Sequence, residues 1–144
     1  MASKKLLLLV EDDPATRYVM KAILRGMGSE YEVISESSHD GAVAALRMAS
    51  VDLMITDLVL SSQDGVAVTR ELRAHDSDLP VIWLTGYGCE HFEREAQELG
   101  VYCCLDKPAP ASLVRRVVRE ALQGHGPVVG RGAPSAAEAI NGDG

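Results

Sequence analysis

The sequence has no apolar run that approaches the ~18 residues of a membrane-spanning helix. The apolar residues 6–10 follow Lys4 and Lys5, as in a signal peptide, but the run is too short, and Glu11 stands where a small-residue cleavage site would follow. Basic residues are outnumbered, because 14 Lys and Arg face 21 Asp and Glu, for a formal net charge of -7. These shortages argue against a membrane partner and against direct binding to nucleic acid.

Cysteine is scarce as well, with three residues in 144: Cys89, Cys103 and Cys104. Their spacing is not that of metal ligands, and an odd number leaves at least one thiol unpaired. We expect the free cysteines of a reducing compartment, with Cys103 and Cys104 packed in the core, and therefore a cytoplasmic protein. The single tryptophan, Trp83, is expected to be a packing residue.

Short apolar runs alternate five times with segments of helical periodicity. The strands are predicted at Lys5–Val10 and at residues 31–35, 51–57, 80–84 and 102–105. The helices are predicted from Asp13-Pro14 to Gly26 and at residues 38–49, 64–73, 90–99 and 111–122. This alternation predicts an α/β domain whose parallel sheet is covered by helices on both faces.

The composition changes at Gly124. Residues 124–144 are rich in glycine, include Pro127 and Pro134, and have little apolar content. Such a segment does not bury enough apolar surface to offset the entropy lost on folding. We therefore divide the chain into a folded domain of residues 1–123 and a disordered tail or linker remnant of residues 124–144.

Polar side chains follow four of the predicted strands. Asp12 and Asp13 come after the first strand, Asp57 ends the third, Thr85 follows the fourth and Lys107 follows the fifth. The carboxyl ends of parallel strands meet at one edge of the sheet, where ligands of open α/β sheets bind. Two carboxylates ~4 Å apart repel by about 4 kcal/mol at an effective dielectric of ~20, so the acids need a cation between them.

The residues at this edge are suited to phosphoryl transfer. Lys107 supplies one positive charge, and Mg²⁺ suits a set of oxygen ligands. Metal and lysine would neutralise the phosphoryl oxygens while the Asp57 carboxylate attacks in line. Each residue alone has an ordinary explanation, such as a helix N-cap for Asp13 or a turn for Thr85, so the prediction depends on their joint occurrence.

Four motifs stand at the ends of the first, third, fourth and fifth predicted strands. They are Leu9-Val10-Glu11-Asp12-Asp13, Asp57 with Asp64-Gly65, Val81-Ile82-Trp83-Leu84-Thr85-Gly86, and Leu105-Asp106-Lys107-Pro108. Together they resemble the receiver domain of two-component response regulators over about residues 5–122. The resemblance implies a flavodoxin-like fold with strand order 2-1-3-4-5 and a switch that is phosphorylated by a histidine kinase or phosphotransfer protein.

The resemblance also implies a role for each site residue. Asp57 is the phosphoacceptor, Lys107 contacts the phosphoryl group and Thr85 supplies the switch hydroxyl. A cis peptide between Lys107 and Pro108 would aim the lysine at Asp57. The implied Mg²⁺ ligands are Asp12, Asp13, Asp57 and the carbonyl of Val59. Glu11 is the weaker candidate among the three acids that follow the first strand.

The sequence departs from the family pattern near the site. Ser61 stands where many receivers have proline, and Cys104 stands where the switch aromatic is usual. Val59 and Tyr87 occupy the positions that face the attacking water, so we expect slow self-dephosphorylation. Strand alternation places Tyr102 on the same face as Cys104, and packing around Tyr102 is expected to help replace the missing ring.

The resemblance to receivers leads us to expect a stand-alone receiver that acts on an output partner protein or forms a phosphorylation-dependent dimer. Several alternatives stand beside this expectation. The chain is also compatible with a receiver cut from a larger protein, such as a hybrid sensor histidine kinase. A Mg²⁺-dependent aspartyl-phosphate phosphatase is a weaker alternative, because Val59 replaces the aspartate that such enzymes use as general acid. The acids after the first strand argue against a flavin module, since they would repel its phosphate.

Overall fold

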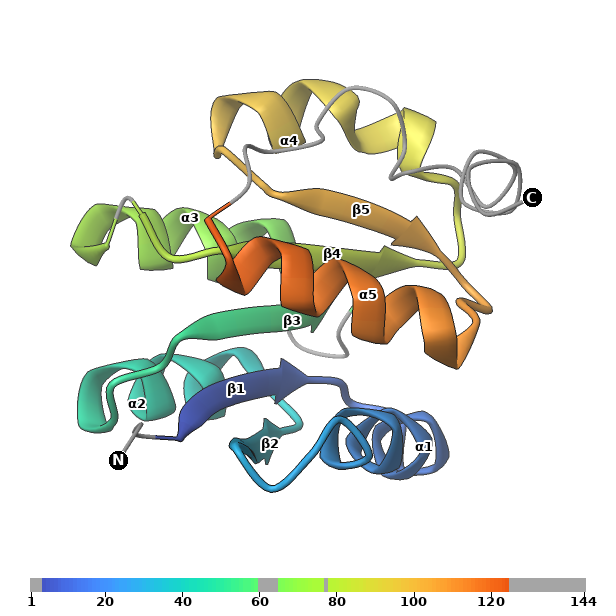
Figure 1. The fold of residues 1–144 in the computed structure, drawn as a ribbon. Coiled ribbons are helices and arrows are strands. Elements are labelled where there is room, and N and C mark those ends of the chain that lie inside the picture. The colour runs from blue at the N-terminus through green and yellow to red at the C-terminus, as the bar shows by residue number, and fades with distance from the viewer. Residues whose placement is uncertain (1–3, 60–64, 77, 125–144) are drawn as a thin grey trace.

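The computed structural model describes residues 4–59, 65–76 and 78–124. Within them the elements are β1 (Lys5–Val10), α1 (Pro14–Arg25), β2 (Tyr31–Glu36), α2 (His39–Met48), β3 (Leu53–Asp57), α3 (Gly65–His75), β4 (Val81–Thr85), the 3-10 helix η1 (Cys89–Phe92), α4 (Glu93–Glu98), β5 (Cys103–Asp106) and α5 (Ala111–Leu122). The strands form one parallel sheet in the order β2-β1-β3-β4-β5, which confirms the predicted fold (Figure 1). None of the described helices is long and apolar enough to cross a membrane.

Three predictions from the sequence concern residues outside these ranges. Ser61, Asp64 and residues 125–144 are not among the described residues. The division into a domain of residues 1–123 and a tail therefore stays a prediction.

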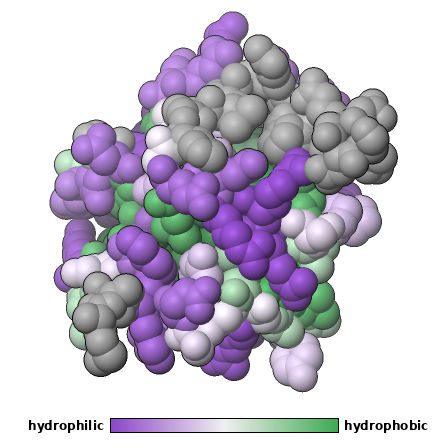
Figure 2. Space-filling view, viewed as in Figure 1, coloured by the Kyte–Doolittle hydropathy of each residue, from purple (hydrophilic) through white to green (hydrophobic). Residues whose placement is uncertain are grey.

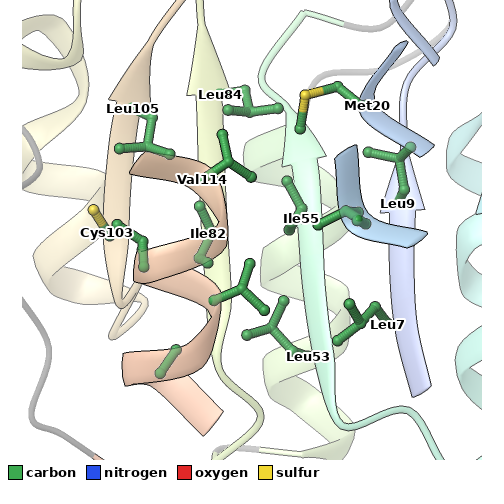
Figure 3. Close-up of a cluster of buried hydrophobic side chains, with 14 of the residues drawn as sticks. Leu7, Leu9, Met20, Leu53, Ile55, Ile82, Leu84, Cys103, Leu105 and Val114 are labelled. Atoms are coloured by element: carbon green, nitrogen blue, oxygen red, sulfur yellow. The ribbon is translucent and has the colours of Figure 1, made fainter. Parts of the chain in front are cut away.

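Consecutive apolar residues in the central strands supply both faces of the sheet. In β1, Leu7 and Leu9 point to the face covered by α1 and α5, while Leu8 and Val10 point to the face covered by α2, α3 and α4. Figure 3 shows the first of these clusters, with Met20 of α1 and side chains of α5 packed over four strands. This two-sided burial fixes the strands so that their carboxyl ends form one edge.

The amphipathic pattern of α5 is confirmed with its predicted bounds. Its buried residues all lie on one side of the helix: Leu113, Val114, Val117, Val118 and Ala121. Arg119 is exposed on the other side, and the surface over this face of the molecule is largely hydrophilic (Figure 2). Burying each valine or leucine stabilises the packing by about 1.5–3 kcal/mol.

The segment predicted as one helix over residues 90–99 differs most from its prediction. It forms η1 and then α4, because Phe92, the last residue of η1, has φ -123° and ψ 12° and interrupts the helical backbone. Gly88 precedes η1 with φ 93° and has no side chain to cap it. Several other bounds shift by one or two residues, and Thr85 and Asp106 are the last residues of β4 and β5.

The prediction that Tyr102 shares a face with Cys104 is wrong. Tyr102 packs in the cluster under α1 and α5, together with Cys103, whereas Cys104 packs on the opposite face with Trp83. Strand alternation does not apply because β5 begins at Cys103, after Tyr102.

The prediction of free cysteines is also wrong for two of the three. Cys89 of η1 and Cys104 of β5 form a disulfide, with their Cα atoms 5.9 Å apart, and Cys103 is free and buried. The pairing depends on how the chain after β4 folds back onto β5, which a separation of 15 residues does not reveal.

Gly65 is required where α3 begins, because its backbone passes directly beside the end of β3. A Cβ atom at this position would overlap the carbonyl oxygen of Asp57 and lie 3.0 Å from Cα of Leu58. We expect Gly65→Ala to push α3 outward and to lower the free energy of unfolding by about 1–3 kcal/mol. Urea unfolding measures this as a lower midpoint with an unchanged slope.

Gly86→Ala is the matched control, since nothing lies within 4 Å of its Cβ position. It should change the free energy of unfolding by less than about 0.5 kcal/mol. Equal midpoints for the two variants would contradict the steric constraint at Gly65.

Candidate functional site

The structure brings the predicted chemical residues to one edge of the sheet. Asp12 follows β1, Asp57 is the last residue of β3, Thr85 is the last residue of β4, and Lys107 follows β5. The parallel register aligns these ends, with Asp57 opposite Leu84 and Thr85 opposite Asp106. The acids, the hydroxyl and the lysine therefore come from four adjacent strands.

Three carboxylates gather closely at this edge. Ligand oxygens of Glu11, Asp12 and Asp57 all lie within 4.8 Å of one another. Glu11 is 1% exposed and Asp57 is 6% exposed, so their charges are shielded from water. Buried charges of one sign require a compensating cation.

Lys107 provides this compensation within the chain. Its Nζ donates hydrogen bonds to Oδ2 of Asp57 at 2.5 Å and to Oε1 of Glu11 at 2.9 Å. The other oxygen of Asp57, Oδ1, accepts a hydrogen bond from the backbone N–H of Val59 at 2.8 Å. Asp57 is thus held through both oxygens, and the Lys107–Pro108 peptide is cis, as predicted.

The burial and the ion pairs shift two pKa values. Burial raises the pKa of Glu11, although the hydrogen bond from Lys107 opposes the shift. Burial alone would lower the pKa of Lys107, but its bonds to Asp57 and Glu11 outweigh that effect and raise it. Lys107 is therefore fully charged at neutral pH, while the Glu11 carboxylate takes up a proton more readily than an exposed one.

The acids that follow β1 do not all lie in the site as predicted. Asp13 is exposed, and its Oδ2 accepts hydrogen bonds from the N–H of Thr16 at 2.8 Å and from its hydroxyl at 2.7 Å. These bonds lower the pKa of Asp13 and make it the N-cap of α1. Glu11, the weaker candidate in the sequence, takes its place in the cluster.

Arg17 is a site residue that the sequence reasoning missed. Its Nη1 donates to the carbonyl oxygen of Glu11 at 2.8 Å and to that of Asp12 at 3.3 Å. Arg17 fixes the backbone that carries both acids and adds positive charge beside them. The sequence does indicate this contact: Arg17 lies one helical turn after the N-cap Asp13, and the first turn of α1 lies over the acidic segment.

Thr85 is buried, and its hydroxyl is already engaged. Oγ1 accepts a hydrogen bond from the N–H of Tyr87 at 3.0 Å, and the carbonyl of Thr85 accepts one from the N–H of Lys107 at 2.8 Å. Tyr87 itself is 66% exposed, and Val59 is also exposed. The threonine therefore links the loop after β4 to the residue that neutralises Asp57.

Comparison with known proteins places this geometry in context. A family model, the response regulator receiver domain, matches residues 7–119. The chain is similar to the transcriptional regulatory protein ZraR of Salmonella typhimurium, with 31% identity over 134 residues that cover 92% of this chain and 30% of ZraR. It is also similar to the DNA-binding response regulator MtrA of Mycolicibacterium smegmatis, with 39% identity over 79 residues that cover 55% of this chain and 33% of MtrA. The chain thus spans about a third of the length of these relatives.

Solved structures give the same result. The receiver domain of the sensor histidine kinase PA1611 from Pseudomonas aeruginosa, which has a magnesium ion coordinated in its active-site cleft, is 28% identical, with a TM-score of 0.75 over 84% of this chain and 99% of that one. A response regulator receiver domain protein from Clostridium thermocellum is 25% identical, with a TM-score of 0.76 over 83% of this chain and 95% of that one.

Lys107→Met tests whether the lysine compensates the buried acids. The variant leaves the acids without their cation, so we expect the free energy of unfolding at neutral pH to fall by about 3 kcal/mol, as when one partner of a buried ion pair is removed. Because the folded state raises the pKa of Lys107, its stabilisation is complete below the ordinary value of 10.5 and is lost as pH rises through the raised value.

Lys107→Arg, which keeps the charge, is the matched control in urea unfolding without divalent cations. The deficit of the methionine variant should shrink in acid as Glu11, whose pKa is raised by burial, becomes protonated. A deficit independent of pH would show that packing, not charge, explains the loss.

Proposed function

The chain belongs to the response regulator receiver domain family, and from that premise we propose that Asp57 accepts a phosphoryl group from a histidine kinase or phosphotransfer protein. Receiver domains are generally signalling switches rather than enzymes acting on free substrates. The observation that supports this role most directly is the position of Asp57, whose Oδ2 meets Lys107 beside the carboxylates of Glu11 and Asp12. A charge added at Asp57 would enter a site that already holds a cation in place.

The chemical step needs an oxygen nucleophile and a way to hold negative charge. In the proposed step, a carboxylate oxygen of Asp57 forms the bond to phosphorus while the bond from phosphorus to the donor histidine nitrogen breaks. The electron pair stays on the imidazole nitrogen, and the product is an aspartyl phosphate. Lys107 turns from the carboxylate to the phosphoryl oxygens, and the hydroxyl of Thr85 at the same edge supplies a further donor.

The cluster of acids fits Mg²⁺, because its ligand atoms are carboxylate oxygens at one edge of the sheet. We assign the ligand roles to Asp12, Asp57 and the carbonyl of Val59, with Glu11 where the sequence suggested Asp13. Bound Mg²⁺ would neutralise charge on the phosphoryl oxygens. Asp12 and Glu11 are held for this task by the bonds of Arg17 to their carbonyls.

A protein donor also needs a surface to dock on, and the structure has an apolar groove beside Lys107. The groove has a volume of about 380 Å³ and lies between α1 and the segment after β5. Val19 and Met20 line it from α1, and Pro108 and Ala109 line it from the other side. A donor helix that packs here would bring its phosphohistidine close to Asp57.

The alternatives follow from the same residues. A phosphatase would need a general acid two residues after Asp57, and Val59 has none. Receiver domains occur both in regulators such as ZraR and in the sensor kinase PA1611, so this domain is compatible with either setting. The output partner, or a second phosphorylated copy, would read the state of Asp57.

Phosphorylation of Asp57 is tested with a small phosphodonor in the presence of Mg²⁺. We expect intact mass to rise by roughly 80 Da, the mass of an added phosphoryl group, and hydroxylamine to remove it because the product is an acyl phosphate. Asp57→Asn and addition of a chelator should each abolish the gain. Asp40→Asn, an exposed acid on α2, is the control and should leave it intact. A gain that survives Asp57→Asn would disprove the assignment.

The residues at the mouth of the site predict a long-lived phosphoryl group. Hydrolysis requires a water in line with the Asp57–phosphorus bond, and neither Val59 nor the exposed ring of Tyr87 offers a carboxylate or amide to orient it. The double variant Val59→Asn, Tyr87→Glu should shorten the lifetime by roughly tenfold or more, within the range of general base effects. The loss of the added mass over time measures this, and equal lifetimes would show that these positions do not control the water.

A further inference from the structure

A covalent link joins the loop after β4 to the neighbouring edge strand. Cys89 begins η1, four residues after Thr85, and its sulfur is bonded to that of Cys104 in β5. The N–H of Cys89 also donates a hydrogen bond to Oδ1 of Asp106 at 2.9 Å. The start of η1 is therefore attached to β5 at two positions two residues apart.

The three residues before this attachment are tied to the site at their other end. The N–H of Tyr87 donates to the hydroxyl of Thr85, and Gly86 and Tyr87 are exposed. A side chain that is 66% exposed, like that of Tyr87, adds little packing. The hydrogen bond at Thr85 and the bonds at Cys89 therefore hold this loop. Of these, the disulfide is the covalent bond that a reductant can break.

We propose that Cys89 and Cys104 are a redox-controlled pair that regulates the proposed phosphorylation of Asp57. The disulfide holds the Tyr87 amide on the Thr85 hydroxyl and so opposes the movement of that hydroxyl toward phosphoryl oxygens on Asp57. In the reduced protein only the hydrogen bond from Cys89 to Asp106 still attaches the loop to β5, so the loop moves more freely and Thr85 can follow the new charge. The inference rests on the proposed function only for its effect on Asp57.

The chemistry requires an oxidant, which we take to be a peroxide. One thiol attacks a peroxide oxygen to give a sulfenic acid and water, and the second thiol attacks that sulfur and releases another water. Two thiols and one hydrogen peroxide thus give one disulfide and two waters. A dithiol reverses the step by exchange through a mixed disulfide.

The chain contains its own control and its own reporter. Cys103 is free and buried, and burial raises its pKa to about 12, so Cys103→Ala serves as the control that leaves the Cys89–Cys104 pair intact. Trp83 lies opposite Cys104 in the strand register and packs in the same cluster as Cys89. Its fluorescence should therefore change when the pair is oxidised or reduced, whether or not Asp57 is phosphorylated.

The first test follows the pair alone. Treatment of the reduced protein with hydrogen peroxide should lower the intact mass by about 2 Da, from the loss of two hydrogens, and change the fluorescence of Trp83. Amide hydrogen exchange at Tyr87 should be slower in the oxidised protein. Cys103→Ala should respond in the same way, whereas Cys89→Ala and Cys104→Ala should not. Failure of the disulfide to form, or equal exchange at Tyr87 in both states, would overturn the proposal.

The second test measures coupling to Asp57. With a small phosphodonor and Mg²⁺, the oxidised protein should gain the phosphoryl group at least about fivefold more slowly than the reduced protein. This factor is at the lower end of the couplings seen between two sites. Dithiothreitol should restore the rate. Circular dichroism checks that the alanine variants fold. If only one of Cys89→Ala and Cys104→Ala folds, that variant is enough for the comparison. Equal rates would overturn the regulatory role. No phosphorylation in either state would instead refute the proposed function, and the exchange measurement would still decide whether the pair holds the loop.

Discussion

The ion pair between Lys107 and the buried carboxylates is the interaction on which the site depends. Asp57 and Glu11 come from the ends of β3 and β1, near the centre of the sheet, whereas Lys107 follows the edge strand β5. The lysine must therefore extend past the end of β4 to reach them. Without it, two buried acids beside Asp12 would repel one another in a region where charge costs several kcal/mol to bury. The register of the sheet places the acids at one edge, and the side chain of Lys107 must point along that edge to pair with them.

A short series of buried hydrogen bonds links Trp83 in β4 to the residue that follows Asp57 at this edge of the sheet. The indole N–H of Trp83 donates to the hydroxyl of Thr69 at 2.8 Å, and that hydroxyl donates to the carbonyl of Gly65 at 2.8 Å. Gly65 in turn donates its N–H to Leu58, the residue after Asp57. A buried indole needs such a partner, so Trp83 packs as predicted but also links β4 to the start of α3. The chain of hydrogen bonds therefore runs from Trp83 to Leu58, the residue that follows Asp57.

The local sequence signals predicted well what depends on neighbouring residues. Asp13-Pro14 indicated the start of α1 because an N-cap and its helix lie within one turn. The helical spacing of the apolar residues in α5 predicted its bounds. The strand ends predicted the site edge, since parallel strands align their carboxyl ends. The same reasoning could not separate Glu11 from Asp13 as members of the cluster: three consecutive acids look alike in sequence. The N-cap bonds of Asp13 to Thr16 decide between them. The pairing of Cys89 with Cys104 and the face of Tyr102 depend on a loop path that no local pattern specifies.

The charge balance links phosphorylation to everything else at the edge. An aspartyl phosphate would add negative charge where Glu11, Asp12 and Asp57 already carry three carboxylates, and Lys107 cannot neutralise all of it. A bound divalent cation and the hydroxyl of Thr85 are the remaining groups that can respond. A phosphoryl group shifts a conformational equilibrium only by the difference in its contacts with the two states. In this chain Lys107 and Thr85 can contribute to that difference, whereas Cys104 has no aromatic ring to contribute. The disulfide between Cys89 and Cys104 restrains the loop whose Tyr87 N–H bonds the Thr85 hydroxyl, and it therefore acts on the contribution that this hydroxyl would make.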